Sequence, residues 1–160
     1  MLEMRVFRAD LKPKETEEYI KGHQKVLEAY GVTQITSADL GWTKEPYSYI
    51  TIARDKDTKE ILGGGRIQLA GSSNPLPIET AIDELDSRVY CFVKEKNLMG
   101  GTGEYCGLWN SKKIAGYGIG SRVLMRVGVA VMSQINISSL LAFVSPATIN
   151  GGKKLGFQII

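Results

Sequence analysis

The chain has 160 residues and a net charge of +3, with 43% hydrophobic and 23% charged residues. These values are typical of one globular domain with its own core, and the charge is too small by itself to indicate nucleic-acid binding. Cys91 and Cys106 are the only cysteines and His23 is the only histidine, which argues against a disulfide framework and a structural zinc site. The first residues lack the apolar core of a signal peptide, and the apolar run over 123–132 is too short to span a bilayer. We therefore expect a cytoplasmic protein with no metal, no membrane and no nucleic-acid partner.

The first part of the chain predicts a strand and a helix. Residues 4–8 alternate weakly, as a short strand does. Pro13 is suited to the first turn of a helix and Gly31 to its end, and apolar side chains three or four residues apart give this helix one packed face. His23 falls on that face, where we interpret it as a packed histidine rather than a catalytic one.

A β-hairpin follows. Residues 49–53 and 61–70 have the composition of strands, and the polar segment 54–60 between them is typical of a turn. Glycines 63–65 lie inside the second strand, where they predict a bulge or a close approach of two backbones.

Residues 77–92 predict one helix, because apolar side chains recur there at helical spacing. The segment 104–110 then reads as a strand, and an apolar helix extends from the following glycine-rich loop to about Ser133. We expect this helix to be buried between layers, with Gly128 packed tightly against the sheet.

The last part of the chain predicts a buried strand over 140–144, a short helical segment over 146–155 and the beginning of a strand over 157–160. Strands and helices mixed in this order predict one α/β domain.

The most informative segment is the loop between the strand at 104–110 and the helix that follows, Ala115-Gly116-Tyr117-Gly118-Ile119-Gly120. Alternating glycines let successive backbone N–H groups turn toward one point, and a helix N-terminus adds unpaired donors and the positive end of its dipole. The arrangement predicts a cradle for a phosphate or pyrophosphate. Four cations surround the loop, either to bind that anion or as a solvated helix face: Lys112, Lys113, Arg122 and Arg126.

Together these features resemble the GNAT superfamily of N-acyltransferases. Its members hold the pyrophosphate of coenzyme A in a loop of the form Gln/Arg-x-x-Gly-x-Gly/Ala between the fourth strand and the central helix, and residues 115–120 match it. The run Lys154-Leu155-Gly156-Phe157 is also similar to one in the family. The resemblance implies a single α/β GNAT-like domain over 1–160, with a mixed central sheet of about six to seven strands flanked by helices. It also implies that coenzyme A is bound by Leu108 and Asn110, through their backbones, and by Ala115, Gly116, Tyr117, Gly118, Ile119, Gly120, Ser121 and Arg122.

The sequence departs from this family at three places. Ala115 stands where the loop usually has Arg or Gln, so the loop has one side chain fewer to bind phosphate unless Lys112 or Lys113 takes that role. Gly152 stands where many members have a tyrosine that protonates the leaving thiolate. The chain has room for only part of the sixth strand after Phe157, which predicts a domain lacking its last strand or a homodimer in which another subunit supplies it.

A fainter similarity concerns the acyl-homoserine-lactone synthases and long-chain N-acyl amino acid synthases, which share the GNAT fold and usually take acyl groups from acyl carrier protein. The runs 65–69 and 76–79 and the position of Glu104 are similar to theirs. Gly107 stands where that branch usually has Arg, and the intact glycine loop favours coenzyme A as the donor.

We expect an N-acyltransferase that moves an acyl group, by default acetyl, from acetyl-CoA or another acyl-CoA to a small amine or amino-acid-like acceptor by direct attack. Glu104 is the candidate general base, with an ordinary strand-edge carboxylate as the alternative, and Glu79 is a weaker candidate. Tyr105 and Tyr117 are candidate acids, while Cys106 reads as a buried strand thiol. The alternatives are a carrier-protein-dependent synthase with a deep apolar tunnel, and a non-catalytic coenzyme A-binding domain. The acceptor pocket is expected between residues 12–47 and 72–102.

Overall fold

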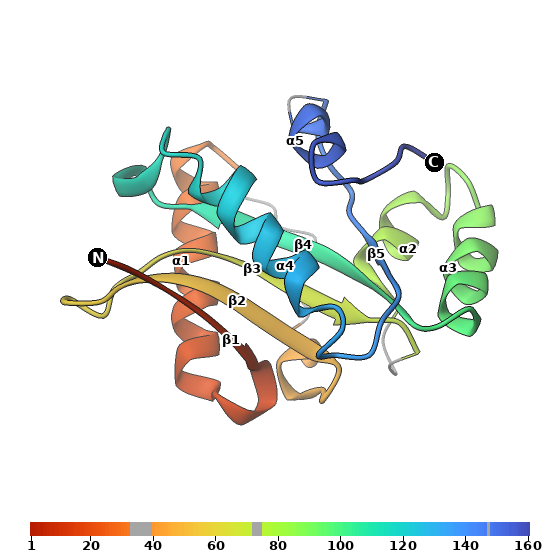
Figure 1. Ribbon diagram of the computed structural model, residues 1–160, viewed down its shortest axis with the longest axis horizontal. Coiled ribbons are helices and arrows are strands. Elements are labelled where there is room, and N and C mark those ends of the chain that lie inside the picture. Colours follow the sequence, from red (N-terminus) through yellow and green to blue (C-terminus); the bar gives the residue numbers. More distant parts are fainter. Residues whose placement is uncertain (33–39, 72–74, 147) are drawn as a thin grey trace.

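The computed structural model describes residues 1–32, 40–71, 75–146 and 148–160 (Figure 1). A mixed sheet forms the centre of one α/β domain, as predicted, with strands in the order β1-β2-β3-β4-β5. The β4–β5 pair is parallel and the other three pairs are antiparallel. The five strands found among the described residues are one or two fewer than predicted: β1 (Leu2–Arg8), β2 (Ser48–Asp55), β3 (Ile61–Leu69), β4 (Thr102–Asn110) and β5 (Ser139–Leu141).

Helices cover both faces of this sheet. In Figure 1, α1 lies behind the sheet and α4 in front of it, while α2 and α3 stand beside β5. None of the helices in the described ranges is long and apolar enough to cross a membrane. The α-helices are α1 (Pro13–Ala29), α2 (Pro77–Ile82), α3 (Arg88–Leu98), α4 (Met125–Val131) and α5 (Ile149–Lys153). Shorter helical turns are η1 (Ala9–Leu11), η2 (Gly41–Lys44), η3 (Lys112–Ile114) and the π-helical η4 (Ile119–Leu124).

Strand alternation divides the core between the two faces. On β2, Ile50 and Ile52 point to the α1 face and Thr51 to the α4 face. The α1-face cluster consists of Ala9, Tyr19, Trp42, Ile50, Ile52 and Trp109. The α4-face cluster consists of Ile67, Tyr105, Met125, Val131, Ile135 and Ile137, and a smaller one beneath α2 and α3 of Leu76, Ile78, Val89 and Val93.

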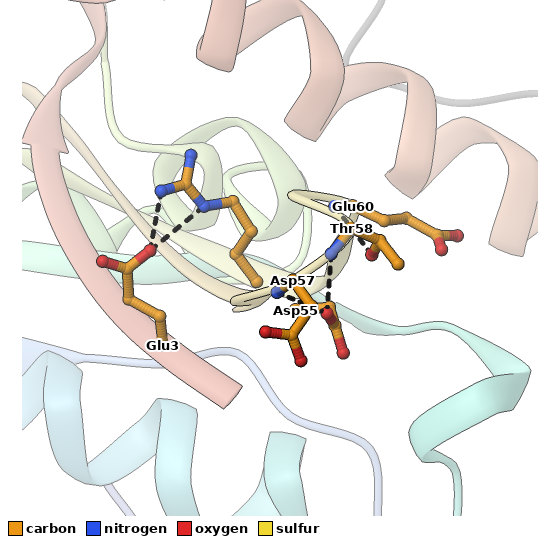
Figure 2. A network of polar contacts seen from close by, with 6 residues as sticks. Glu3, Asp55, Asp57, Thr58 and Glu60 are labelled. Carbon is orange, nitrogen blue, oxygen red and sulfur yellow. Dashed lines mark hydrogen bonds and ion pairs between the residues drawn. The ribbon is translucent and has the colours of Figure 1, made fainter. Parts of the chain in front are cut away.

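The predicted hairpin forms, and its turn is held by local hydrogen bonds (Figure 2). Asp55 Oδ1 accepts the backbone N–H groups of Asp57 and Thr58 at 2.8 and 2.9 Å, and Thr58 Oγ1 accepts that of Glu60 at 3.4 Å. These N–H donors hold the pKa of Asp55 below its usual value. The same view shows Glu3 on β1 accepting two hydrogen bonds from the guanidinium of Arg54 on β2, so the hairpin is also tied to β1.

The glycines of β3 leave room for aromatic side chains to pack directly against the strand backbone. A Cβ on Gly64 would lie 2.8 Å from the ring of Tyr19, and one on Gly65 would lie 2.6 Å from the ring of Tyr105. A residue with a side chain at either position would displace an aromatic ring, on the α1 face in one case and on the α4 face in the other. The bulge on β3 lies at Leu62, next to these glycines, where the β2–β3 register shifts; at the β3–β4 shift between Gly64 and Arg66 the extra residue belongs to β4.

The prediction of one helix over 77–92 is wrong. The chain leaves the helix after Ile82, and the side chain of Leu85, expected on the apolar stripe, is 85% exposed. The next helix, α3, begins at Arg88 with Ser87 as its N-cap. In the turn before it, Asp86 Oδ1 accepts the N–H of Arg88 at 3.1 Å and the Asp86 carboxylate pairs with the Arg88 guanidinium. The apolar periodicity therefore continues across a turn that divides the segment into two helices.

The segment after the glycine loop also differs from its prediction. It begins as the π-helical η4, continues as α4 and ends at Val131 rather than near Ser133. It is not buried on all sides, because Arg126 and Ala130 are exposed. Gly128 does pack tightly, since a Cβ there would lie 3.2 Å from the ring of Tyr105.

The C-terminal part has less sheet than predicted. The predicted strand over 140–144 is only β5, which ends at Leu141, and its residues are half-buried. The predicted strand over 157–160 does not form, because no described strand runs beside this segment to pair with it. The short helix expected within 146–155 is present as α5.

Candidate functional site

The sheet opens between β4 and β5. The two strands pair only from Thr102 to Glu104 on β4, opposite Ser139 to Leu141 on β5. From Tyr105 to Asn110, β4 continues with no strand beside it on the β5 side in the described part of the chain. Because strand backbones carry a donor and an acceptor at each residue, this length of β4 forms an open edge that an extended ligand can pair with.

A bulge shapes this open edge. Gly107 and Leu108 together stand opposite Gly65, and Gly107 adopts φ +57°, which glycine tolerates without a Cβ penalty. Tyr19 of α1 donates its hydroxyl to the Gly107 carbonyl at 2.7 Å and so holds the bulge from the α1 face. The predicted donor-binding residues Leu108 and Asn110 lie at and just beyond this bulge, with the Leu108 side chain exposed.

The glycine loop lies between the end of β4 and the start of η4. Gly116 and Gly118 both have positive φ angles, +84° and +73°, as expected for a loop that turns its N–H groups to one side. The first hydrogen bond of the helix runs from Arg122 N–H to the Gly118 carbonyl at 2.9 Å. The N–H groups of Ile119 and Gly120 come before it and are therefore available to an anion.

Asn110 connects the loop to the strand. A Cβ on Gly120 would lie 2.3 Å from Asn110 Nδ2, so only glycine lets the start of η4 approach the end of β4. Asn110 Oδ1 and the neighbouring Ser111 Oγ are buried without a hydrogen-bond partner. Unsatisfied polar atoms are uncommon in protein interiors, so a bound group beside the loop is one explanation for these two.

The cations near the loop differ in their availability. Lys113 forms an ion pair with Glu60 at the hairpin, which leaves it less free to bind phosphate in place of the Arg or Gln that Ala115 replaces. Lys112, Arg122 and Arg126 are exposed and form no ion pair with another described residue. Tyr117 is 78% exposed in the loop itself.

Glu104 is the buried carboxylate of the site. It lies where β4 and β5 separate, is 2% exposed, and its Oε2 accepts the backbone N–H of Ile78 at 2.6 Å. Burial raises its pKa to about 7, despite the opposing effects of that N–H and of the charge on Arg66. A carboxyl group with this pKa is near half ionisation at neutral pH, which suits a general base.

The other candidate acids and bases have structural roles. Glu79 caps α2, since its Oε2 accepts the N–H of Leu76 at 2.8 Å. Tyr105 lies on the α4 face, opposite to Glu104, where its hydroxyl donates to the Leu124 carbonyl at 3.0 Å and contacts Thr51 Oγ1 at 2.8 Å.

Cys106 and His23 also lack the features of a catalyst. Burial raises the pKa of Cys106, and its Sγ accepts a hydrogen bond from Arg66 Nε at 3.3 Å, so the sulfur is a thiol at neutral pH. His23 stacks beside Tyr19 with ring centres 6.3 Å apart, and burial lowers its pKa, which keeps it neutral. His23 packs beside Tyr19 as predicted, whereas Cys106 lies on β4 but is half-buried rather than fully buried.

Sequence reasoning missed the polar side chains that surround Glu104. The strand register places two lines of residues on the α1 face, Ile50–Arg66–Cys106 and Ser48–Gln68–Glu104. We call Ser48, Arg66, Gln68, Glu104 and Cys106 the polar row. The signal in the sequence is Arg66 and Gln68 alternating on an otherwise apolar strand, because polar residues at every second position share one face.

A large apolar groove adjoins the site. Its volume is about 920 Å³. Ile78 and Leu141 line it and are both neighbours of Glu104: the N–H of Ile78 donates to the Glu104 carboxylate, and Leu141 is opposite Glu104 in the β4–β5 register. Gly152 also lines this groove, and no side chain stands there to donate a proton. A second, smaller cavity of about 590 Å³ lies between α1 and η2, within the region expected to form the acceptor pocket.

No family model and no curated protein sequence matches the chain. Solved structures do match over its whole length. FeeM, an N-acyl amino acid synthase from uncultured soil microbes, has a TM-score of 0.74 at 15% identity, covering 99% of this chain and 79% of that protein. A predicted acetyltransferase from Clostridium acetobutylicum, solved with acetyl-CoA, has a TM-score of 0.64 at 17% identity, covering 100% and 92%.

A third solved structure, glucosamine-6-phosphate N-acetyltransferase from Arabidopsis thaliana, has a TM-score of 0.59 at 10% identity, covering 100% of this chain and 93% of that one. A GCN5-related N-acetyltransferase from Ralstonia eutropha is similar at a TM-score of 0.62 and 13% identity, covering 100% and 94%. The chain therefore has the GNAT acetyltransferase fold. Identities this low concern the fold alone.

Proposed function

We propose that the protein is an N-acyltransferase that moves an acyl group from coenzyme A to the amine of a small or amino-acid-like acceptor. The observation that carries the proposal is the juxtaposition of the glycine loop, the open edge of β4 and the buried carboxylate of Glu104. The loop suits a pyrophosphate, the edge suits the extended arm that joins it to a thioester, and Glu104 stands at the end of that edge.

The residues of the loop fit the proposed donor. The N–H groups of Ile119 and Gly120 precede the first helical hydrogen bond, and Asn110 Oδ1 beside them has no partner. Exposed Lys112 and Arg122 add positive charge without a carboxylate paired to them in the described ranges. Ala115 contributes only its backbone, so the loop binds through N–H groups and these two cations.

Glu104 performs the proton chemistry in this proposal. An amine reaches the enzyme largely as an ammonium ion and must lose a proton before it attacks the thioester carbonyl. The Glu104 carboxylate accepts that proton. Unpaired N–H groups on the open edge of β4 stabilise the oxyanion that forms on the carbonyl, and a fixed orientation of amine and thioester supplies much of the remaining rate.

The leaving thiolate takes its proton from the attacking nitrogen. Bond formation between nitrogen and the carbonyl carbon leaves a proton on nitrogen that must depart, and cleavage of the carbon–sulfur bond creates a thiolate that needs one. Neither Tyr105 nor residue 152 competes for this role, because the Tyr105 hydroxyl donates to Leu124 and residue 152 is glycine. This direct transfer requires no additional acid.

Donor binding is the first test. Thermal unfolding is measured with acetyl-CoA, a long-chain acyl-CoA, coenzyme A and adenosine bisphosphate, since a ligand that binds only the folded state raises the midpoint by mass action. Gly118→Asp places a negative charge in the loop and should abolish the shift. Gly71→Asp is the matched control. Gly71 has a similar positive φ of +86°, but it follows the C-terminal end of β3 and is not part of the glycine loop. Equal shifts in both variants would exclude the loop as the donor site.

The apolar groove favours a second candidate, a synthase that takes a long acyl chain from acyl carrier protein. Its wall reaches Glu104 through Ile78 and Leu141, so a chain attached to the reacting carbonyl could extend into it. Each buried methylene contributes about 0.8 kcal/mol, roughly fourfold in affinity. A series of donors from acetyl to dodecanoyl, each on coenzyme A and on carrier protein, distinguishes the candidates. Rising kcat/KM with chain length on carrier protein alone would favour the synthase.

A further inference from the structure

Arg66 lies in the middle of the polar row and has an unusual environment for a buried guanidinium. The residue is 7% exposed. Its Cζ stands 4.3 Å from the ring centre of Trp42, and its Nε donates to Cys106 Sγ at 3.3 Å. No carboxylate in the described ranges forms an ion pair with it.

The buried carboxylate of Glu104 acts electrostatically on Arg66 without contacting it. Glu104 lies diagonally across the β3–β4 pair, since Arg66 faces Cys106 and Gln68 faces Glu104. The carboxylate of Glu104 accepts the Ile78 N–H instead of a guanidinium N–H. Burial of an arginine without a paired anion costs free energy, and a ligand that supplied the anion would offset that cost.

The hydrogen-bonding capacity of Arg66 indicates which anion fits. Arginine has five N–H donors in a planar fork, and only Nε–H is used by a described residue. The unused end of the fork matches the two oxygens of a carboxylate. Trp42 covers one face of the guanidinium plane, so the ligand approaches the edge of that plane.

A second buried group beside Arg66 also lacks a partner. Ser48 is 1% exposed, and its Oγ has no hydrogen-bond partner. It faces Gln68 on β3 and is therefore a diagonal neighbour of Arg66 on the same face of the sheet. Gln68 is occupied, because its Nε2 donates to the Pro75 carbonyl at 3.0 Å. Two unsatisfied groups thus lie together within one polar row.

Building on the acyltransferase function proposed above, we propose that Arg66 binds the carboxylate of the acceptor, and that the acceptor is an amino acid whose amine faces Glu104. Diagonal neighbours on a sheet have Cβ atoms about 7–8 Å apart. The carboxylate and amine of an α-amino acid are separated by a single carbon, so one such molecule can reach both side chains. Arg66 fixes the orientation of the acceptor, and Glu104 accepts the proton that its ammonium group loses.

The experiment compares amino acids with the amines obtained by removing their carboxylate. Phenylalanine is paired with phenethylamine and leucine with isopentylamine, and release of the donor thiol is followed. We expect kcat/KM to be at least about tenfold higher for the amino acid of a pair, the size of one charge-assisted hydrogen bond. In Arg66→Gln, kcat/KM for the amino acid should fall about ten- to a hundredfold, chiefly because KM rises. The kcat/KM of the amine without a carboxylate should change little.

Two further variants control for structural effects. Arg66→Lys keeps the charge but loses the fork, so its KM for amino acids should lie between those of the unaltered protein and Arg66→Gln. Arg54→Gln removes an arginine of β2 that is paired with Glu3, and should leave the preference for amino acids unchanged. An unchanged midpoint shift with coenzyme A shows that each variant is folded around the donor site.

Binding is measured separately from turnover, by titration calorimetry of phenylalanine and leucine into the protein saturated with coenzyme A. If these amino acids bind the unaltered protein and not Arg66→Gln, yet no acceptor is acylated, the carboxylate site stands and the proposed acyl transfer fails. Equal use of amino acids and decarboxylated amines would overturn the assignment of Arg66. A parallel loss of both in Arg66→Gln, or donor binding without any amino-acid binding, would also overturn it.

Discussion

Two buried polar regions on opposite faces of the sheet, the surroundings of Tyr105 and the polar row, differ in how completely their side chains are hydrogen-bonded. On the α4 face, the hydroxyl of Tyr105 has two partners, the Leu124 carbonyl and Thr51 Oγ1. On the α1 face, Ser48 Oγ and Trp109 Nε1 are buried with no partner, and Arg66 uses only one of its nitrogens toward a described residue. Each face contains a buried apolar cluster.

This difference distinguishes buried polar groups that stabilise the fold from buried polar groups that are available to a ligand. A buried group that is fully hydrogen-bonded stabilises the fold, whereas a buried group without partners costs free energy unless a ligand satisfies it. In the part of the chain that the structure describes, the buried side-chain atoms without a partner are Ser48 Oγ, Trp109 Nε1, Asn110 Oδ1 and Ser111 Oγ. Ser48 lies in the polar row, where we propose the acceptor, and Asn110 and Ser111 lie beside the glycine loop, where we propose the donor.

The largest expected effect is that of Glu104→Gln on the reaction. We expect kcat to fall by about 10²- to 10⁴-fold, because an amide cannot accept the proton of the ammonium group. The amide oxygen can still accept the Ile78 N–H, so the fold and the midpoint shift with coenzyme A should persist. In the unaltered protein kcat should rise as pH increases through about 7, the pKa of Glu104. Turnover that is insensitive to the substitution would exclude Glu104 as the base.

The same substitution should change the pH dependence of stability. The folded protein retains the Glu104 proton up to about pH 7, whereas the unfolded chain loses it near the ordinary pKa of 4.5. Stability from this group is therefore complete below pH 4.5 and is lost as pH rises through 7, by an amount on the order of 3 kcal/mol. Urea unfolding of both proteins from pH 4.5 to 8.5 measures it, since all other titrating groups cancel in the difference. Parallel curves would contradict the shifted pKa.

The smallest effects come from a matched pair of hydroxyl deletions, one on each face. Tyr105→Phe should destabilise the fold by about 1–3 kcal/mol, because the Leu124 carbonyl and Thr51 lose a buried partner. Ser48→Ala should instead stabilise the ligand-free protein, by about 1 kcal/mol, because it removes a buried hydroxyl that has no hydrogen-bond partner. Equilibrium unfolding in urea without ligand gives both values. Equal losses would remove the distinction between the two faces.

The parts of the fold that follow local rules could be predicted from the sequence. The hairpin over β2 and β3 follows from alternation and a polar turn, and the close approaches at Gly65 and Gly128 follow from the missing side chains. The break after Ile82 could not be read from periodicity, because the apolar spacing continues through the turn between α2 and α3, where Leu85 is exposed.

The candidate site could be predicted only in part. The glycine loop is recognisable in the sequence as a motif, and Glu104 is recognisable by its position at the start of the predicted strand. Arg66 and Ser48 become informative only when the register of three strands shows that they share a face with Glu104. Absence of a partner is a property of the folded molecule, and no one-dimensional pattern reports it.

The hydrogen bond from Tyr19 to Gly107 joins residues 88 positions apart. It fixes the bulge of β4 from α1, so the open edge of that strand cannot take its final form until the N-terminal helix has docked. During synthesis α1 emerges well before β4. The two elements contact each other only after the long segment between them has folded into a closed loop. A chain interrupted before that closure could form its glycine loop, yet it would lack the curved strand edge against which a thioester is aligned.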